Sequence, residues 1–163
     1  MGRRGGEVRG APGGVEVVSV ERGGLATVHV PGQLIAYGLI DLGRRGVGVR
    51  AYVRALEAGV IAYLASMGIA AGRATGRPGV WVGQAKIAAV GIHVRRGVTL
   101  HGVALNLSPD LAAFDWIIPC GLPDASVTSV AALRGGHLLP HREASAFGHH
   151  LRAAIVDTLR RGG

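Results

Sequence analysis

Two residues in this sequence have side chains suited to group transfer, and each type occurs once. Lys86 is the only lysine among 18 Lys and Arg residues, and Cys120 is the only cysteine. An arginine stays charged at any accessible pH, whereas the amine of a desolvated lysine can give up its proton near neutrality. A cysteine attacks as the thiolate, and a thiol with an ordinary pKa of about 8.5 provides little thiolate at pH 7.

An ammonium group close to the sulfur would change that balance. At a separation of about 4 Å and an effective dielectric constant of about 20, it would favour the thiolate by up to about 4 kcal/mol and so lower the pKa of the thiol. The two residues therefore predict an acyl-transfer dyad, with Cys120 as the nucleophile and Lys86 as its proton-transfer partner. The ordinary alternative is that the cysteine is a small buried hydrophobe and the lysine a solvated charge.

The composition limits the class of protein. The 163 residues suffice for a single domain with one core, and the glycine-rich segment 1–14 is expected to be flexible. No run of 18 apolar residues predicts a membrane helix, and the N-terminus lacks the apolar centre of a signal peptide. A single cysteine excludes an intramolecular disulfide, so we expect a cytoplasmic protein without membrane contact.

The formal net charge is +8, but the arginines are scattered and no basic stripe alternates with aromatic residues. We therefore expect no nucleic-acid partner, although a basic nucleic-acid module is a distant alternative. A diffuse positive field suits acidic protein partners, mainly through the association rate. The histidines lack the spacing of a helical metal pair, so no metal site is expected.

Hydrophobic periodicity predicts the elements that position the two reactive side chains. Strands are expected at 15–20, 25–30, 33–42 and 80–82, helices at 48–67, 108–115 and 143–160, and a loop at 69–79. Residues 86–107 are expected to form a β-hairpin with a three-residue connection, Arg95-Arg96-Gly97. Strict alternation would place Lys86 on the same face as Ala88, with Ile87 on the other.

Two of these elements carry further expectations. In the helix at 48–67, apolar residues repeat in steps of three and four from Val49 to Met67, which leaves Glu57 outside the buried stripe. In the hairpin, small residues stand where strands usually prefer bulk: Ala88, Ala89, Gly91, Gly102 and Ala104. They would leave space above the sheet, either for a substrate or for a closely packed helix.

Several segments, in matching order and spacing, resemble the octanoyltransferase family (lipoyl(octanoyl) transferase, or lipoate-protein ligase B). These are RGGLATVHVPGQ at 22–33, GVWV at 79–82, KIAAVG at 86–91, RGVTLHGVALN at 96–106, PDL at 109–111, and IPCG at 118–121 with TS at 128–129. The resemblance covers about residues 15–132. The chain departs from it at Val30, where the family has glycine, and it is expected to lack the family's N-terminal segment with an HPPVYTLGR-like motif.

The resemblance implies a fold and an activity. The fold would be of the α/β (α+β) type, a mixed β-sheet flanked by helices, as in biotin and lipoate protein ligases. The enzyme would move an octanoyl group from acyl carrier protein to a lysine of lipoyl domains, the first step of endogenous lipoate synthesis and protein lipoylation. The acceptors would be the lipoyl domains of 2-oxoacid dehydrogenase complexes and the glycine cleavage H protein. No cofactor would be needed, neither ATP nor a metal.

The resemblance also implies roles for individual residues. Cys120 would carry the acyl group as a thioester, and Lys86 would lower the pKa of the thiol and shuttle protons. Residues expected to contact the substrate are Arg22, Gly23, Gly24, Leu25, Ala26, Thr27, Val28, His29, Ala89, Val90, Gly91, Gly102, Val103 and Ala104. His101 falls in a matching segment and is a candidate for lining the same site.

Two alternatives keep the fold but change the function. One is a truncated, inactive relative or a binding protein. The other is an ATP-dependent lipoate or biotin ligase, in which the lysine would contact the adenylate and no cysteine would be required. Formation of a cysteine adduct without ATP separates both from the transferase.

Overall fold

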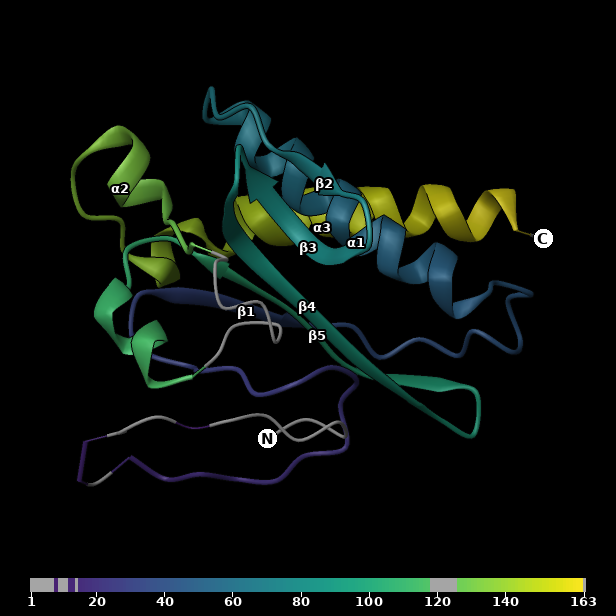
Figure 1. Cartoon of the computed structure of the whole chain (residues 1–163). Helices are drawn as coiled ribbons and strands as arrows, with labels where there is room; N and C mark the ends of the chain where they lie inside the picture. The colour runs from purple at the N-terminus through teal and green to yellow at the C-terminus, as the bar shows by residue number, and fades with distance from the viewer. Residues whose placement is uncertain (1–7, 9–11, 14, 118–125, 163) are drawn as a thin grey trace.

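The computed structural model describes residues 8, 12–13, 15–117 and 126–162. Its elements are, in order, β1 (Gln33–Tyr37), α1 (Val49–Ser66), β2 (Gly72–Ala74), β3 (Arg77–Val82), β4 (Ala85–Arg95), β5 (Val98–Asn106), the 3₁₀ helix η1 (Leu111–Trp116), α2 (Val130–Arg134) and α3 (Pro140–Arg161). The strands form a five-stranded sheet in the order β1-β5-β4-β3-β2, and neighbouring strands run antiparallel (Figure 1). Among the described residues, parallel pairing is limited to a bridge between Lys86 and Val127.

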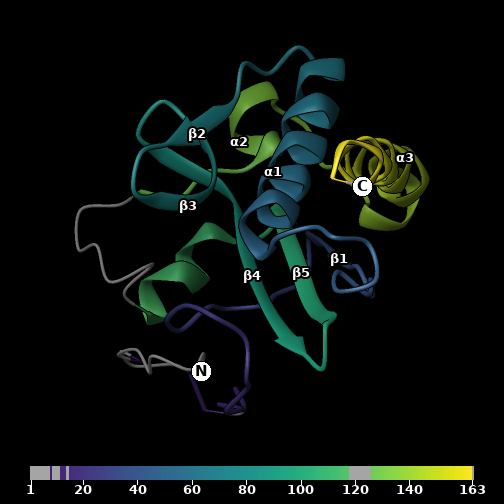
Figure 2. The same cartoon turned by 90° about the vertical axis from the view of Figure 1, so that its right-hand side faces the viewer.

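The sheet has different coverings on its two faces. Helices α1 and α3 lie on one face, and the segment before β1 runs along the other (Figures 1 and 2). The amide of Gly23 in that segment donates to the carbonyl of Ile92 on β4 over 2.8 Å. This arrangement leaves one face of the hairpin for the core and the other for a site. It confirms the expected sheet packed with helices, but the paired strands are antiparallel and not mixed as expected.

Helix α1 is buried more widely than its periodicity predicts. Val49, the expected start of the apolar stripe, is 47% exposed, whereas Tyr52 and Tyr63 are buried. Glu57, expected outside the stripe, is also buried. The reason is that α1 packs against the sheet on one side and against α3 on the other. A single-stripe analysis assumes one partner, so it was wrong for Val49, Tyr52 and Glu57, whereas the central part of the predicted stripe is buried as expected: Leu56, Val60, Tyr63 and Leu64.

The α1–α3 contact depends on a glycine in the middle of α1. A Cβ atom added at Gly59 would lie 2.7 Å from the Cα of Leu151, whereas one added at Gly148 on α3 would meet nothing within 4 Å. Both substitutions gain about 1 kcal/mol of helix propensity, but only the first forces two helices apart. We therefore expect Gly59→Ala to lower the free energy of unfolding by about 1–2 kcal/mol and Gly148→Ala to raise it by about 0.5–1 kcal/mol. Urea denaturation of both variants checks this, and equal effects would contradict it.

The predicted hairpin is confirmed, with two corrections at its turn. Strand β4 pairs with β5 up to Arg95 and Val98, so the connection has two residues instead of three. Both Arg96 (φ 49°) and Gly97 (φ 84°) adopt the left-handed conformation, which is the geometry of a two-residue turn matched to strand twist. The sequence did not predict this turn because an arginine occupies its first position, where glycine or asparagine is the usual signal.

Other boundaries differ because pairing depends on tertiary position. Residues 15–20 and 25–30 form no strand, because the segment before β1 runs along the face of the sheet and does not extend it (Figures 1 and 2). The predicted strand 33–42 ends at Tyr37, and the predicted loop 69–79 contains β2. Within segment 1–14, most of which lies outside the described residues, Val8 pairs with Ile117. No helix in the described part of the chain is long and apolar enough to cross a membrane.

Candidate active site

Lys86 reaches the site because β4 contains one extra residue. Trp81 pairs with Lys86 but Val80 pairs with Ala88, so Ile87 is unmatched on β3 and forms a β-bulge. The bulge turns Ile87 and Ala88, both fully buried, toward the helices, and Lys86 toward the opposite face with Ala89. The expectation from strict alternation was therefore wrong for Lys86 and Ile87.

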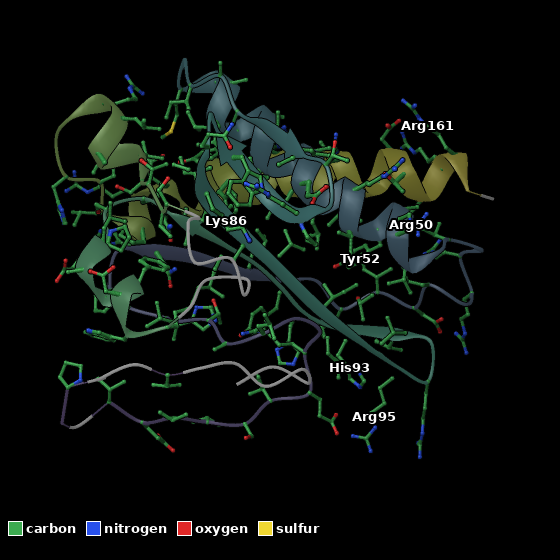
Figure 3. All side chains as sticks on the ribbon, in the orientation of Figure 1. Arg50, Tyr52, Lys86, His93, Arg95 and Arg161 are labelled. Atoms are coloured by element: carbon green, nitrogen blue, oxygen red, sulfur yellow. The ribbon has the colours of Figure 1, made fainter. Side chains whose placement is uncertain are left out.

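The amine of Lys86 is held between an aromatic ring and a glycine. The residue is 7% exposed, and its Nζ lies 5.1 Å from the centre of the Trp81 ring, within the range of a cation–π interaction. A Cβ added at Gly79 would lie 3.0 Å from Cε and 3.4 Å from Nζ of Lys86. Figure 3 shows Lys86 at one end of β4 and His93 near the other. Lys86 is thus a buried, positioned amine and not a solvated surface charge.

The backbone of Lys86 is bonded to the segment that follows the cysteine. Its N–H donates to the carbonyl of Ser126, and its carbonyl accepts from the N–H of Thr128, each over 2.9 Å. Cys120 lies outside the described residues, so its predicted role stays a prediction. On either side of that stretch, Ile117 and Val127 both line the cavity that contains Lys86.

This "lysine cavity" has a volume of about 40 Å³. It is lined by Ala26, Thr27, Gln33, Lys86, Ala89, Asn106, Phe114, Ile117 and Val127. Most of these side chains are apolar, and the polar ones come from β1, β4, β5 and the segment before β1. A single amine in a mainly apolar enclosure is suited to proton transfer.

A second, "sheet cavity" of about 40 Å³ lies over the small residues of the hairpin. Its walls include all six residues expected there, Ala89, Val90, Gly91, Gly102, Val103 and Ala104, together with Arg22, Thr27 and His29. A Cβ at Gly91 would come within 3.1 Å of Cδ of Arg22. The small side chains therefore leave room on this face of the sheet for the segment before β1 and for a cavity. Helix α1 packs on the other face.

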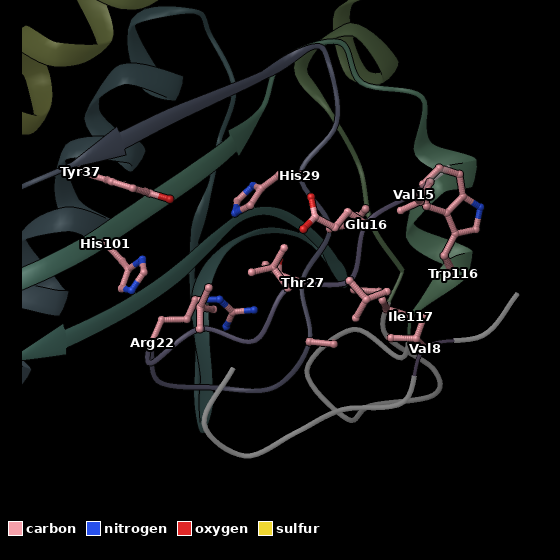
Figure 4. A pocket seen from close by; sticks show the side chains of 15 residues that line it. Val8, Val15, Glu16, Arg22, Thr27, His29, Tyr37, His101, Trp116 and Ile117 are labelled. Atoms are coloured by element: carbon pink, nitrogen blue, oxygen red, sulfur yellow. The ribbon is translucent and has the colours of Figure 1, made fainter. Parts of the chain in front are cut away.

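The largest of the three is an "outer cavity" of about 300 Å³, at the lower end of the range for ligand pockets. It extends from Arg22, Tyr37 and His101 at one end to Trp116 and Ile117 at the other (Figure 4). Four valines of segment 15–20, namely Val15, Val17, Val18 and Val20, contribute to its wall. Thr27 borders all three cavities, so they meet around one side chain.

The side chain of His101 lines the site because the backbone at this residue departs from a regular strand. Along β5 it would share a face with Thr99 and Val103, but its φ of 62° is left-handed, and its ring lines the outer and sheet cavities beside Tyr37. Burial, and then the neighbouring Arg22 guanidinium, hold the pKa of His101 below its ordinary value. The imidazole is therefore neutral at pH 7.

This shift predicts how stability depends on pH. Because His101 binds its proton more readily in the unfolded chain, its contribution to stability is present above about pH 6.5 and is lost as the pH falls toward the folded pKa. Asparagine tolerates the left-handed backbone and does not titrate. We expect His101→Asn to lose less unfolding free energy than the wild type between about pH 7 and pH 5. Urea denaturation at both pH values measures this, and equal losses would contradict the burial of His101.

The structure gathers most, but not all, of the expected substrate contacts. Arg22, Ala26, Thr27, Val28 and His29 line one or more of the cavities. By contrast, Gly23, Gly24 and Leu25 line none of the three. Gly23 instead anchors the segment to β4, and Gly24 has a φ of 94°, which a turn requires.

Other residues of the site were missed. Gln33 and Asn106 bond to each other at the lysine cavity, and Trp81 lies against Lys86. All three fall inside the matching segments, which were the available signal. The side chain of His93 is only 16% exposed, and its Nε2 lies 3.5 Å from Oε2 of Glu21. Among the described residues, no group of three metal-binding side chains could hold a metal ion.

A profile of the lipoyl protein ligase A/B catalytic domain matches residues 10–152. The chain belongs to this family. It is 50% identical to an octanoyltransferase of Desulfovibrio desulfuricans over 124 residues, which are 76% of this chain and 52% of that protein. It is 48% identical to an octanoyltransferase of Novosphingobium aromaticivorans over 150 residues, covering 88% and 67%. The predicted resemblance is confirmed, although the chain spans only about half to two thirds of these relatives.

Solved structures of the ligase family share the fold. Lipoate-protein ligase A bound with ATP matches with a TM-score of 0.61 at 16% identity, over 90% of this chain and 60% of that one. Biotin protein ligase from Aquifex aeolicus matches with a TM-score of 0.59 at 14% identity, over 80% and 54%. These identities concern the fold alone, and they confirm the expected biotin and lipoate ligase architecture.

Proposed function

We propose that this chain is an octanoyltransferase that moves an octanoyl group from acyl carrier protein to a lysine of a lipoyl domain through a thioester on Cys120. One observation carries the proposal. The buried amine of Lys86 shares its cavity with Ile117 and Val127, which flank the stretch that contains the single cysteine. Cys120 follows Ile117 by three residues in the sequence, and three residues of chain span at most about 11 Å, so the chain length allows the thiol to reach this cavity.

The reaction has two half-reactions on one nucleophile. The Cys120 thiolate attacks the thioester carbonyl, a new S–C bond forms, and the S–C bond to the carrier's phosphopantetheine breaks. Lys86 gives a proton to the departing thiol. The acceptor amine then attacks the enzyme thioester, the S–C bond to Cys120 breaks, and the amine's proton returns to Lys86. Neither half-reaction needs ATP, a metal or another cofactor.

The cavities suit an acyl chain bound beside this centre. The lysine cavity shares Ala26 and Ile117 with the outer cavity and Ala89 with the sheet cavity. An octanoyl chain attached near Lys86 therefore has apolar walls along which to lie. The family's description as lipoyl protein ligases supports a lipoyl domain as acceptor, including those of 2-oxoacid dehydrogenase complexes and the glycine cleavage H protein. A cytoplasmic setting belongs to the same proposal.

The test is covalent capture followed by transfer. The chain is mixed with octanoyl-acyl carrier protein without ATP, its intact mass is measured, and a lipoyl domain is then added. We expect an octanoyl adduct on the wild type, none on Cys120→Ala, and loss of the adduct when the acceptor is added. An adduct that survives Cys120→Ala would overturn the proposal. Transfer that requires ATP would favour a ligase, and a folded wild type without adduct would favour an inactive relative.

A further inference from the structure

Two amide side chains, one buried and one partly buried, connect both halves of the candidate site. Gln33 on β1 and Asn106 on β5 pair directly across the sheet, and Asn106 is only 4% exposed. The Nε2 of Gln33 donates to Oδ1 of Asn106 over 2.9 Å, and Nδ2 of Asn106 donates to the Thr128 carbonyl over 3.0 Å. At the other end, Oε1 of Gln33 accepts from the Val30 N–H over 3.3 Å.

The backbone groups at the two ends fix the orientation of both amides. The Val30 N–H can only donate and the Thr128 carbonyl can only accept, so Gln33 must present oxygen to the first and Asn106 must present nitrogen to the second. Oε1 of Gln33 also lies 3.2 Å from Nδ1 of His29. That nitrogen must therefore carry the hydrogen, and Nε2 is the acceptor in the neutral ring. All the hydrogen bonds run in one direction.

We call this chain of hydrogen bonds, from Val30 through Gln33 and Asn106 to Thr128, the relay. It ends on Thr128, whose backbone is also bonded to Lys86. The N–H of Thr128 donates to the Lys86 carbonyl, and its carbonyl accepts from Asn106. The register of residues 126–128 against Lys86 is therefore held from both sides. Because this segment follows the stretch with Cys120 in the sequence, the proposed thiol–amine reaction depends on its register. The opposite end of the relay holds Val30 and His29, next to the outer and sheet cavities.

We propose that Gln33 and Asn106 are positioning residues. They hold the segment before β1, which lines the cavities, and residues 126–128, which bond to Lys86, in one fixed arrangement. The inference rests on the proposed function. A buried polar network of this kind is sensitive to the loss of any member, because every remaining group is left unsatisfied. Thr99, on the same strand and fully buried, bonds to the backbone of Gly38 and Ile40 away from the cavities. Thr99 therefore fixes the backbone of another segment through buried hydrogen bonds, without contact to the candidate site.

The test compares Asn106→Leu and Gln33→Met, which keep approximate shape, with Thr99→Val as the matched control. We expect Asn106→Leu to slow adduct formation from octanoyl-acyl carrier protein about 100-fold, the effect of a displacement of about 1 Å. Gln33→Met should slow it less, and the double variant should be no slower than Asn106→Leu, because the residues act as one unit. Thr99→Val should lose stability but form the adduct at the wild-type rate.

Amide hydrogen exchange gives a readout that does not depend on activity. In Asn106→Leu the Thr128 N–H should exchange faster, whereas the Gly23 N–H, bonded to Ile92, should not change. The relay would be overturned if Asn106→Leu and Gln33→Met formed the adduct at the wild-type rate, or if Thr99→Val slowed adduct formation as much as they do. A wild type that forms no adduct would refute the proposed function, while unchanged exchange at Thr128 would refute the relay separately. If Asn106→Leu does not fold, the same two measurements on Gln33→Met, adduct formation and exchange of the Thr128 N–H, test the relay.

Discussion

Replacing Lys86 with methionine is expected to slow octanoyl transfer about 10³-fold while the chain stays folded. Lys86 is 7% exposed and lines the lysine cavity, and its amine lies against Trp81. Methionine has a similar length and fills the same space, but it cannot donate or accept a proton. Because the packed volume is nearly unchanged, we expect the chain to stay folded. Single-turnover adduct formation and circular dichroism measure the two effects.

Two further variants sharpen this prediction. Lys86→Arg keeps the charge but not a proton that can leave, so it should be nearly as slow as methionine. Arg77 lies over the same Trp81 ring, with its guanidinium carbon 5.6 Å from the centre, but on the exposed side of β3. Arg77→Met should therefore transfer at the wild-type rate. Activity within tenfold of wild type in Lys86→Met would remove the amine from the mechanism.

Replacing Glu57 with leucine is expected to lower the free energy of unfolding by about 2–4 kcal/mol. Its carboxylate is buried on α1, accepts from Nε of Arg73 over 2.9 Å and from the N–H of Gly79 over 3.0 Å. Leucine leaves a buried backbone donor without a partner and releases the β2–β3 pair from the helix. Since Gly79 borders the end of Lys86, we also expect slower transfer. Urea denaturation gives the free energy.

The controls for Glu57 separate burial from charge. Glu57→Gln keeps an acceptor for the Gly79 N–H and should lose about half as much stability. Asp157 forms an ion pair of the same 2.9 Å length with Arg161, but with 57% of its side chain exposed. Asp157→Asn should change the free energy of unfolding by less than about 0.5 kcal/mol. If it costs as much as Glu57→Leu, burial is not what makes Glu57 important.

The sequence predicts elements that follow from local pattern. The long helix, the hairpin and the C-terminal helix were expected close to their observed bounds, because three- and four-residue repeats, alternation and turn residues are local signals. It does not predict properties that depend on a second partner. Glu57 is buried because residues of β2 and β3, Arg73 and Gly79, bond to its carboxylate, whereas Val49, the first residue of α1, is exposed.

The candidate site was predicted in part, through matching motifs. Those motifs located Lys86, the small residues of the hairpin and most of segment 22–29. They did not indicate which amide bonds to which, so the relay of Gln33 and Asn106 needed coordinates. They also did not reveal the backbone of His101, since a left-handed histidine within a strand has no sequence signal.

The unmatched Ile87 has a consequence for how this strand can change during evolution or engineering. Inserting one residue on β3 between Val80 and Trp81 would give Ile87 a partner and restore regular alternation along β4, and the side chain at position 86 would then share the face of Ala88, toward the apolar layer under α1. A charged amine is not tolerated there without a partner. A change that only lengthens β3 by a residue would thus both remove the amine from the lysine cavity and insert a cation into the core, so the lengths of these two strands and the chemistry at position 86 are constrained together.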